Sequence, residues 1–217
     1  MFKNLFSWWH EDILLKDALG KSRDALDRAT GMVSFAMQIL LEHSGEGEKI
    51  YKMDAEVNRL QVDVRKKIME HLAVNPAQDV MASLVLTTII VDLERIGDFA
   101  KNIVELDRMC VRKLGGSKYN KEARLITGEL DVSLGKTGAA FTEGDPDSAE
   151  NLMGTFTQIG RRCDSMLEVL VGDEGVSVRE AVIYGLLFRY LKRIACHARN
   201  ICSSVVNPFH RLGYKPD

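Results

Sequence analysis

The chain has 217 residues with a formal net charge of −2, 46% hydrophobic residues and 28% charged residues. This composition is typical of a soluble globular protein of one or two domains. The balanced charge argues against a nucleic-acid-binding protein, which usually carries a strongly basic domain. No apolar run approaches the roughly 20 residues that span a bilayer, and no secretion signal opens the chain, so we expect a cytoplasmic protein.

The first segment in chain order, residues 1–11, is rich in aromatic residues. It contains Phe2, Phe6, Trp8 and Trp9. Two interpretations are open. The segment closes the end of a helical bundle, or it contacts a membrane surface or a partner protein, because exposed aromatic clusters mark interaction sites.

The rest of the chain is predicted to be all-α. Only four prolines occur, and none lies inside a long stretch with helical periodicity. Glycines mark the breaks: Gly45 and Gly47 separate the first two helices, and Gly115 and Gly116 separate the two halves. The predicted helices cover residues 12–43, 48–73, 76–112, 119–143, 146–171 and 175–204.

Two pairs of residues predict helix starts. Asn75-Pro76 and Asp145-Pro146 each offer an N-cap followed by proline at the first helical position. Asp173 lies 98 positions after Asn75, so we expect the last helix to begin in the same way as the third. At about 1.5 Å per residue, the third helix would be roughly 50 Å long.

An internal repeat indicates two related halves. Residues 92–103 read DLERIGDFAKNI, and 98 positions later residues 190–201 read YLKRIACHARNI. A period this long indicates a duplicated domain rather than a solenoid, whose repeats are about 20 to 50 residues long. We therefore predict two tandem, pseudo-symmetric three-helix bundles at residues 12–114 and 118–205, followed by a tail at residues 206–217.

The first copy of the repeat carries two carboxylates, Glu94 and Asp98. They lie four residues apart on the side of the helix opposite its apolar stripe, so both can converge on one cation. The alternative is a solvated helix face whose carboxylates are neutralised by Arg95 and Lys101 without any metal. The preceding helix supplies a second polar pair, Asp54 and Asn58, beside its own apolar stripe.

The second copy reverses this charge. It places Lys192 and Cys196 at the two carboxylate positions, and Arg189 lies on the same face. We interpret Arg189 and Lys192 as a docking face for another protomer or an acidic partner. The spacing of Cys196, His197 and Cys202 fits no common zinc site.

Signatures of enzymes are missing from the sequence. It contains no phosphate-binding glycine loop, no G-x-S-x-G motif and no histidine with glutamate three residues before it. The four cysteines form no C-x-x-C pair and are expected to be reduced thiols. We therefore expect a protein without enzymatic activity.

The phrase L-E-R-I-G-D-x-A-x-N-I, complete once at residues 93–103, resembles the signature of the PhoU family of phosphate-uptake regulators. Members of that family are two tandem three-helix bundles whose paired acidic motifs bind metal ions. The resemblance implies Asp54, Asn58, Glu94 and Asp98 as ligands, with iron, zinc and magnesium as candidate metals. The family pattern has a second aspartate where Asn58 stands, and an amide oxygen contributes no charge to the site.

The resemblance also implies a function. It suggests a non-enzymatic cytosolic regulator of inorganic phosphate uptake and phosphate-starvation signalling, which contacts a phosphate transporter subunit and a sensor histidine kinase. A homo-oligomer is expected. The alternatives are an accessory protein of another phosphate or anion carrier, a metal-dependent helical enzyme that uses Glu94 and Asp98, and a structural oligomerisation module.

Overall fold

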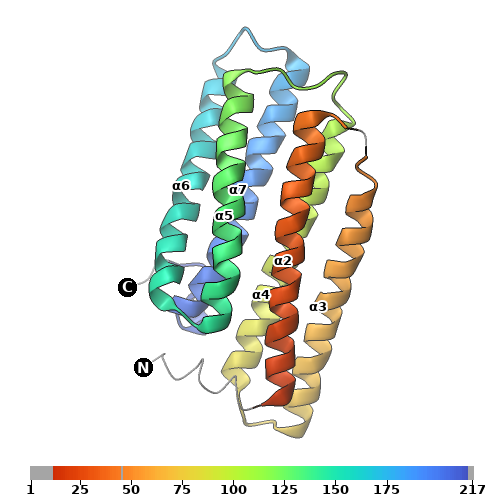
Figure 1. Ribbon diagram of the computed structural model, residues 1–217. Helices are drawn as coiled ribbons and strands as arrows, with labels where there is room; N and C mark the ends of the chain where they lie inside the picture. The colour runs from red at the N-terminus through yellow and green to blue at the C-terminus, as the bar shows by residue number, and fades with distance from the viewer. Residues whose placement is uncertain (1–11, 45, 215–217) are drawn as a thin grey trace.

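The structure is a computed structural model that describes residues 12–44 and 46–214, so the predicted aromatic segment lies outside the described residues. Within these ranges the chain forms six long helices, one short 3₁₀ helix and no strand. Figure 1 shows the elements, which are α2 (Ile13–Glu42), α3 (Lys49–Val74), α4 (Val80–Asp107), α5 (Lys118–Glu143), α6 (Pro146–Val171), α7 (Val178–Val206) and the 3₁₀ helix η2 (Phe209–Arg211).

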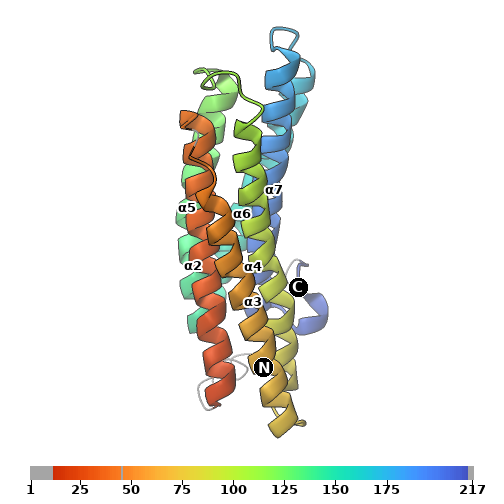
Figure 2. The same cartoon turned by 90° about the vertical axis from the view of Figure 1, so that its right-hand side faces the viewer.

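The helices form two groups of three. In the first half α2 packs against α3 and α4, and in the second half α7 packs against α5 and α6. The halves lie side by side in one elongated bundle (Figure 1, Figure 2), joined where α4 packs against α7 and α2 against α5. The predicted fold class is therefore confirmed, while the predicted domain boundaries remain a prediction.

The repeated sequence forms the apolar centre of both halves. Burying one large aliphatic side chain completely stabilises a fold by about 1.5–3 kcal/mol. Matching apolar positions of the two repeats are buried, 98 positions apart, because they occur at helical spacing along α4 and α7. The matched pairs are Leu93 and Leu191, Ile96 and Ile194, Ala100 and Ala198, and Ile103 and Ile201. Among the described residues, none of the helices has the length and apolarity that crossing a bilayer requires.

The third helix is shorter than predicted. It begins at Val80 rather than at Pro76, because Asn75 ends α3 and Asp79 precedes α4 in a left-handed conformation with φ of 54°. The intervening loop covers the fully buried side chain of His71, whose Nε2 lies 3.2 Å from a backbone carbonyl of the loop. With 28 residues, α4 is about 42 Å long at 1.5 Å per residue.

The last helix also begins later than predicted. The N-cap of α7 is Ser177, whose hydroxyl accepts a hydrogen bond from the backbone N of Glu180 at 3.3 Å and donates to its carboxylate at 2.9 Å. Ser177 and Glu180 have the S-x-x-E spacing of a capping box, which the sequence prediction missed, although the carboxylate bonds the serine hydroxyl rather than its backbone N–H. Asp79 and Ser177 are again 98 positions apart, so the two helix starts are equivalent at a different pair of residues. The predicted N-cap Asp145 is confirmed at the start of α6.

Asp173, which we predicted as the cap of the last helix, connects the turn between α6 and α7 to the start of α5. Its carboxylate accepts hydrogen bonds from Tyr119 Oη at 2.6 Å and from the backbone N of Gly175 at 3.1 Å, and Lys118 Nζ lies 2.8 Å away. The hydrogen bond from Lys118, followed by those from Tyr119 and Gly175, lowers the pKa of Asp173 from 3.8 to about 2.

Asp173→Asn should therefore destabilise the protein at neutral pH. A lowered folded-state pKa contributes stability above the unfolded value, and that stability is lost as the pH falls through the folded value. The difference in urea midpoint between wild type and variant should be largest above pH 3.8 and should shrink toward pH 2 or so. Urea unfolding at a series of pH values measures it, with Asp24→Asn on the exposed side of α2 as the control. A difference that stays constant over this range would contradict the assignment.

Candidate functional site

The predicted ligand residues meet at the boundary between α3 and α4. Asp54 and Asn58 come from α3, and Glu94 and Asp98 come from α4; we call these four residues the acidic cluster. Lys101 lies among them, with its Nζ 3.1 Å from Asp54 Oδ2 and 3.0 Å from Asp98 Oδ1. Asn58 Nδ2 donates to Asp54 Oδ2 at 3.1 Å. The structure thus brings the four residues together around a cationic side chain of the same chain.

The acidic cluster is partly shielded from solvent. The side chains of Asp54, Glu94 and Asp98 are only 14%, 19% and 26% exposed. Asp98 of α4 is joined to Asp54 of α3 through Lys101, so this part of α4 lies against α3. Partial burial strengthens the interaction of these carboxylates with any nearby charge.

The charges of the acidic cluster are unevenly compensated. Arg95 Nη1 donates to Asp98 at 3.1 Å, whereas the nearest approach of Arg95 to Glu94 is 3.8 Å. Burial, and then the negative charge of Asp98, raises the pKa of Glu94 above its usual value. Burial lowers the pKa of Lys101, but its bonds to Asp98 and Asp54 outweigh this and raise it overall. Glu94 is therefore the carboxylate with the least compensation.

The donor atoms of the acidic cluster suit a hard cation. Three carboxylates and one amide oxygen are the ligand types that such cations prefer. As the side chains lie, however, no group of three or more His, Cys, Asp or Glu residues in the described part of the chain could hold a metal ion. Lys101 Nζ lies where a cation bridging Asp54 and Asp98 would bind. A cation bound between Asp54 and Asp98 would have to displace Lys101, whose side chain is long and flexible.

A second polar site, which the sequence prediction missed, lies between the two halves. His197 Nδ1 of α7 lies 2.6 Å from Asp92 Oδ1 of α4, and Asn200 Nδ2 donates to the same oxygen at 3.1 Å. The side chains of Asp92 and His197 are 13% and 12% exposed. Arg193 Nη2 lies 3.4 Å from His197 Nε2, which assigns Nε2 as acceptor and Nδ1 as the donor to Asp92.

The contact between α4 and α7 is pseudo-symmetric. Asp92 and Tyr190 are equivalent in the repeat, and so are Phe99 and His197. Asp92 contacts His197, and their counterparts also face each other, with the rings of Tyr190 and Phe99 5.9 Å apart. The two helices therefore meet through equivalent positions, with a polar pair and an aromatic pair that adjoin where the rings of Phe99 and His197 stack 5.7 Å apart.

The residues predicted for docking have different surroundings. Lys192 Nζ is 2.6 Å from Asp164 of α6, so its charge is compensated. Arg189 is exposed and has no ion-pair partner among the residues that the structure describes. No disulfide forms between the described cysteines, and burial raises the pKa of Cys163 and Cys202 to about 12.

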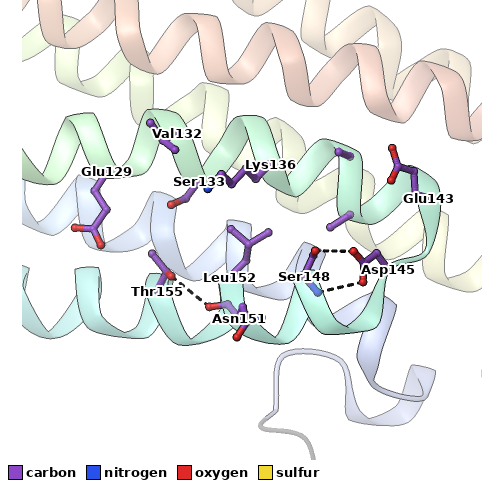
Figure 3. A pocket seen from close by; sticks show the side chains of 12 residues that line it. Glu129, Val132, Ser133, Lys136, Glu143, Asp145, Ser148, Asn151, Leu152 and Thr155 are labelled. Atoms are coloured by element: carbon purple, nitrogen blue, oxygen red, sulfur yellow. Dashed lines mark hydrogen bonds between the residues drawn. The ribbon is translucent and has the colours of Figure 1, made fainter.

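A groove of about 600 Å³ lies between α5 and α6 (Figure 3). Its lining includes Glu129, Lys136 and Glu143 of α5, which carry charges of both signs. Asp145 at its end serves as the cap of α6 and accepts the hydroxyl hydrogen of Ser148 at 2.5 Å. The mixture of charges indicates no particular ligand chemistry for this groove.

Comparison with known proteins finds a family model that matches the first half of the chain. Residues 23–106, which contain the whole acidic cluster, match the model of the PhoU domain. A phosphate-specific transport system accessory protein PhoU homolog from Synechocystis sp. is 24% identical over 161 residues, which cover 72% of this chain and 71% of the relative. A homolog with the same description from Pseudomonas aeruginosa is 24% identical over 182 residues, covering 80% of this chain and 74% of the relative.

Solved structures share the fold. The crystal structure of PhoU from Pseudomonas aeruginosa superposes with a TM-score of 0.81 at 22% identity and covers 88% of this chain and 95% of its own. The phosphate transport system regulatory protein PhoU from Streptococcus pneumoniae gives a TM-score of 0.76 at 18% identity, covering 93% and 94%. With the domain match, these likenesses show that residues 23–106 carry a PhoU domain and that the chain has the fold of the PhoU structures.

Proposed function

We propose that the chain is a cytoplasmic, non-enzymatic regulator of inorganic phosphate uptake. It would bind a subunit of a phosphate transporter and the sensor histidine kinase of the phosphate-starvation response. The observation that carries the proposal is the PhoU domain at residues 23–106, together with relatives described as phosphate-specific transport system accessory proteins.

The shape of the molecule suits an adaptor. Long helices packed along most of their length form a stiff body, and a stiff body can present fixed charged surfaces to a partner. Such a protein changes the conformational equilibrium of a partner only by binding one of its states more tightly than the other. Exposed Arg189 on α7 is the residue we assign to docking, with Lys192 beside it sharing its charge with Asp164.

We further propose that the acidic cluster binds a metal ion that shapes the surface formed by α3 and α4. Asp54, Asn58, Glu94 and Asp98 would hold the ion, with Lys101 displaced. The bound cation would supply positive charge to the docking surface. The proposal is supported by Glu94, the carboxylate of the cluster with the least compensation by nearby cations. We also propose that the protein forms a homo-oligomer, which light scattering of the purified chain would reveal.

Affinity capture tests the regulatory role. The tagged full chain is recovered from native membranes at high and low phosphate, and the bound proteins are identified by mass spectrometry. We expect a phosphate transporter subunit or the sensor kinase, in amounts that depend on phosphate. Arg189→Glu should reduce recovery at least about fivefold, since reversing a charge at an interface costs roughly 1 kcal/mol or more.

The control is Arg65→Glu, which makes the same charge change at an exposed position of α3 and should leave recovery unchanged. Arg189→Glu is preferable to the double variant with Lys192→Glu, which would also place two carboxylates together at Asp164. Recovery of neither partner under both conditions would overturn the proposed role, and equal recovery with both variants would remove Arg189 from the docking surface.

A further inference from the structure

A pocket of about 430 Å³ lies on the second half of the protein, between α6, α7 and the segment that follows η2. Arg161 and Gln158 of α6, Arg199 of α7 and Tyr214 line it. Neither the predicted ligand residues nor the predicted docking residues belong to this pocket. Its two arginines give it a positive charge, against which the carboxylate of Glu150 on its lining is the one negative group among the pocket residues.

The pocket overlaps the place in the second half that part of the acidic cluster occupies in the first. Buried residues of α3 and α6 match at a separation of 99 positions, which aligns the two helices. The matched pairs are Ile50 and Ala149, Val57 and Phe156, Val64 and Cys163, and His71 and Leu170. In this alignment Asp54 and Asn58 correspond to Met153 and Thr157, both of which line the pocket.

The charge at this place is reversed between the halves. Arg199 lies 98 positions after Lys101. Lys101 bridges two carboxylates in the first half, whereas its counterpart Arg199 forms no such bridge in the described part of the second half. Glu94 and Asp98 correspond to Lys192 and Cys196. Lys192 and Cys196 lie outside the pocket lining, so the difference between the halves at this place is the loss of the carboxylates around a cation that both halves keep.

The arginines of the pocket have unused hydrogen-bonding capacity. Arg199 Nη2 donates to the carbonyl of Gly213 at 3.3 Å, but its Nε is buried and has no hydrogen-bond partner. Arg161 is exposed, and neither arginine forms an ion pair within the described residues. A partly buried guanidinium with unmet donors is stabilised when an anion supplies the acceptors.

We propose that this pocket binds a phosphate group. The planar forks of Arg161 and Arg199 match the oxygens of a tetrahedral oxyanion, and the side-chain amide of Gln158 adds further donors. Glu150 supplies an acceptor. Inorganic phosphate at neutral pH keeps a P–OH group that donates to a carboxylate, whereas sulfate carries no hydrogen and is repelled by it. The pocket therefore selects phosphate over sulfate. A phosphate monoester, with a second pKa of about 6, has mostly lost this hydrogen and gains less from Glu150.

The phosphate group has two sources, inorganic phosphate and a small phosphate monoester, and the volume of the pocket accommodates either. Titration of the isolated full chain with each of them, at constant ionic strength, tests the proposal. Two-dimensional ¹⁵N NMR follows the side-chain Nε–H signals of Arg161 and Arg199, which report directly on the guanidinium groups. Inorganic phosphate, glycerol phosphate and sulfate are the three probes.

We expect inorganic phosphate or glycerol phosphate to shift both arginine signals in a saturable way. The probe that binds with the higher affinity identifies which of the two compounds the pocket prefers. Arg161→Gln and Arg199→Gln should each weaken binding about tenfold or more, since each removes a charge-assisted contact. Arg161→Gln is the safer variant because Arg161 is exposed, while Arg199 also holds the Gly213 carbonyl. Arg65→Gln on α3 is the matched control and should bind as wild type does.

The absence of saturable shifts with phosphate and glycerol phosphate, or equal binding by wild type and Arg161→Gln, would overturn the proposal. Sulfate binding as tightly as phosphate would overturn the selectivity assigned to Glu150. Because no transporter or kinase is present, these outcomes do not depend on the regulatory role. Partner capture can therefore fail while the pocket binds phosphate. Phosphate binding can likewise fail while partner capture succeeds.

Discussion

Lys101→Met should bind a divalent metal ion about 100-fold more tightly than the wild type. The ammonium group lies about 3 Å from both Asp54 and Asp98 and competes with any cation for the same oxygens. At an effective dielectric constant of 20, a unit charge 4 Å from another interacts by about 4 kcal/mol, and screening at a partly exposed site reduces this to roughly 3 kcal/mol, or about 100-fold. Methionine keeps the length of the side chain without its charge.

Titration with Mn²⁺ followed by electron paramagnetic resonance measures the affinity, with Mg²⁺ and Zn²⁺ as competitors. Lys66→Met, at an exposed position of α3 away from the acidic cluster, should leave the affinity unchanged. Glu94→Gln/Asp98→Asn should abolish binding, and elemental analysis of the purified proteins should show the same order. If Lys101→Met binds no more tightly than wild type, Lys101 does not compete; if none of the variants differs, the metal proposal is wrong.

Asp92→Leu should lower the free energy of unfolding by about 3 kcal/mol, because it leaves two buried donors, on His197 and Asn200, without their acceptor. Leucine replaces the carboxylate with a side chain of similar size, so the loss of packing is small. Urea unfolding of the purified protein measures the change. Asp24→Leu, an exposed substitution in α2, serves as the control and should change the stability little.

The pseudo-symmetry of the contact suggests a pair of substitutions that should compensate each other. Asp92→Tyr/His197→Phe recreates at this position the aromatic pair that Tyr190 and Phe99 form at the equivalent positions. An aromatic pair contributes roughly 0.5–1.5 kcal/mol beyond its buried area, so the double variant should be more stable than either single substitution. Strictly additive losses would show that the two pairs are not interchangeable.

Local patterns predicted most of the fold. Apolar spacing, glycine breaks and the repeat predicted six helices in two groups, because these signals depend on residues close in sequence. Ser177 was also visible as a capping residue three positions before Glu180, and it was overlooked in favour of Asp173. The start of α4 had no comparable local signal, since the left-handed conformation of Asp79 accompanies a loop folded over buried His71.

The candidate sites were predicted unevenly for the same reason. Carboxylates four residues apart are a local pattern, so Glu94 and Asp98 were found, and the resemblance supplied Asp54 and Asn58. The pairing of Asp92 with His197 joins residues more than 100 positions apart, which no periodicity reveals. The repeat did contain a signal. Polar Asp92 matches aromatic Tyr190, and aromatic Phe99 matches polar His197. Such paired changes are expected of residues that face each other across a pseudo-symmetric contact.

The contact between α4 and α7 has a consequence for how the two halves diverged. Helices that meet through equivalent positions have the geometry of two identical subunits related by a two-fold axis. Identical subunits must change together, since one gene encodes both, so a site gained on one is gained on the other. Joining them in a single polypeptide removes that constraint and keeps the partners at high local concentration. Only after such a fusion could one side keep the carboxylates Glu94 and Asp98 while its counterpart carried Lys192 and Cys196 at the matching positions.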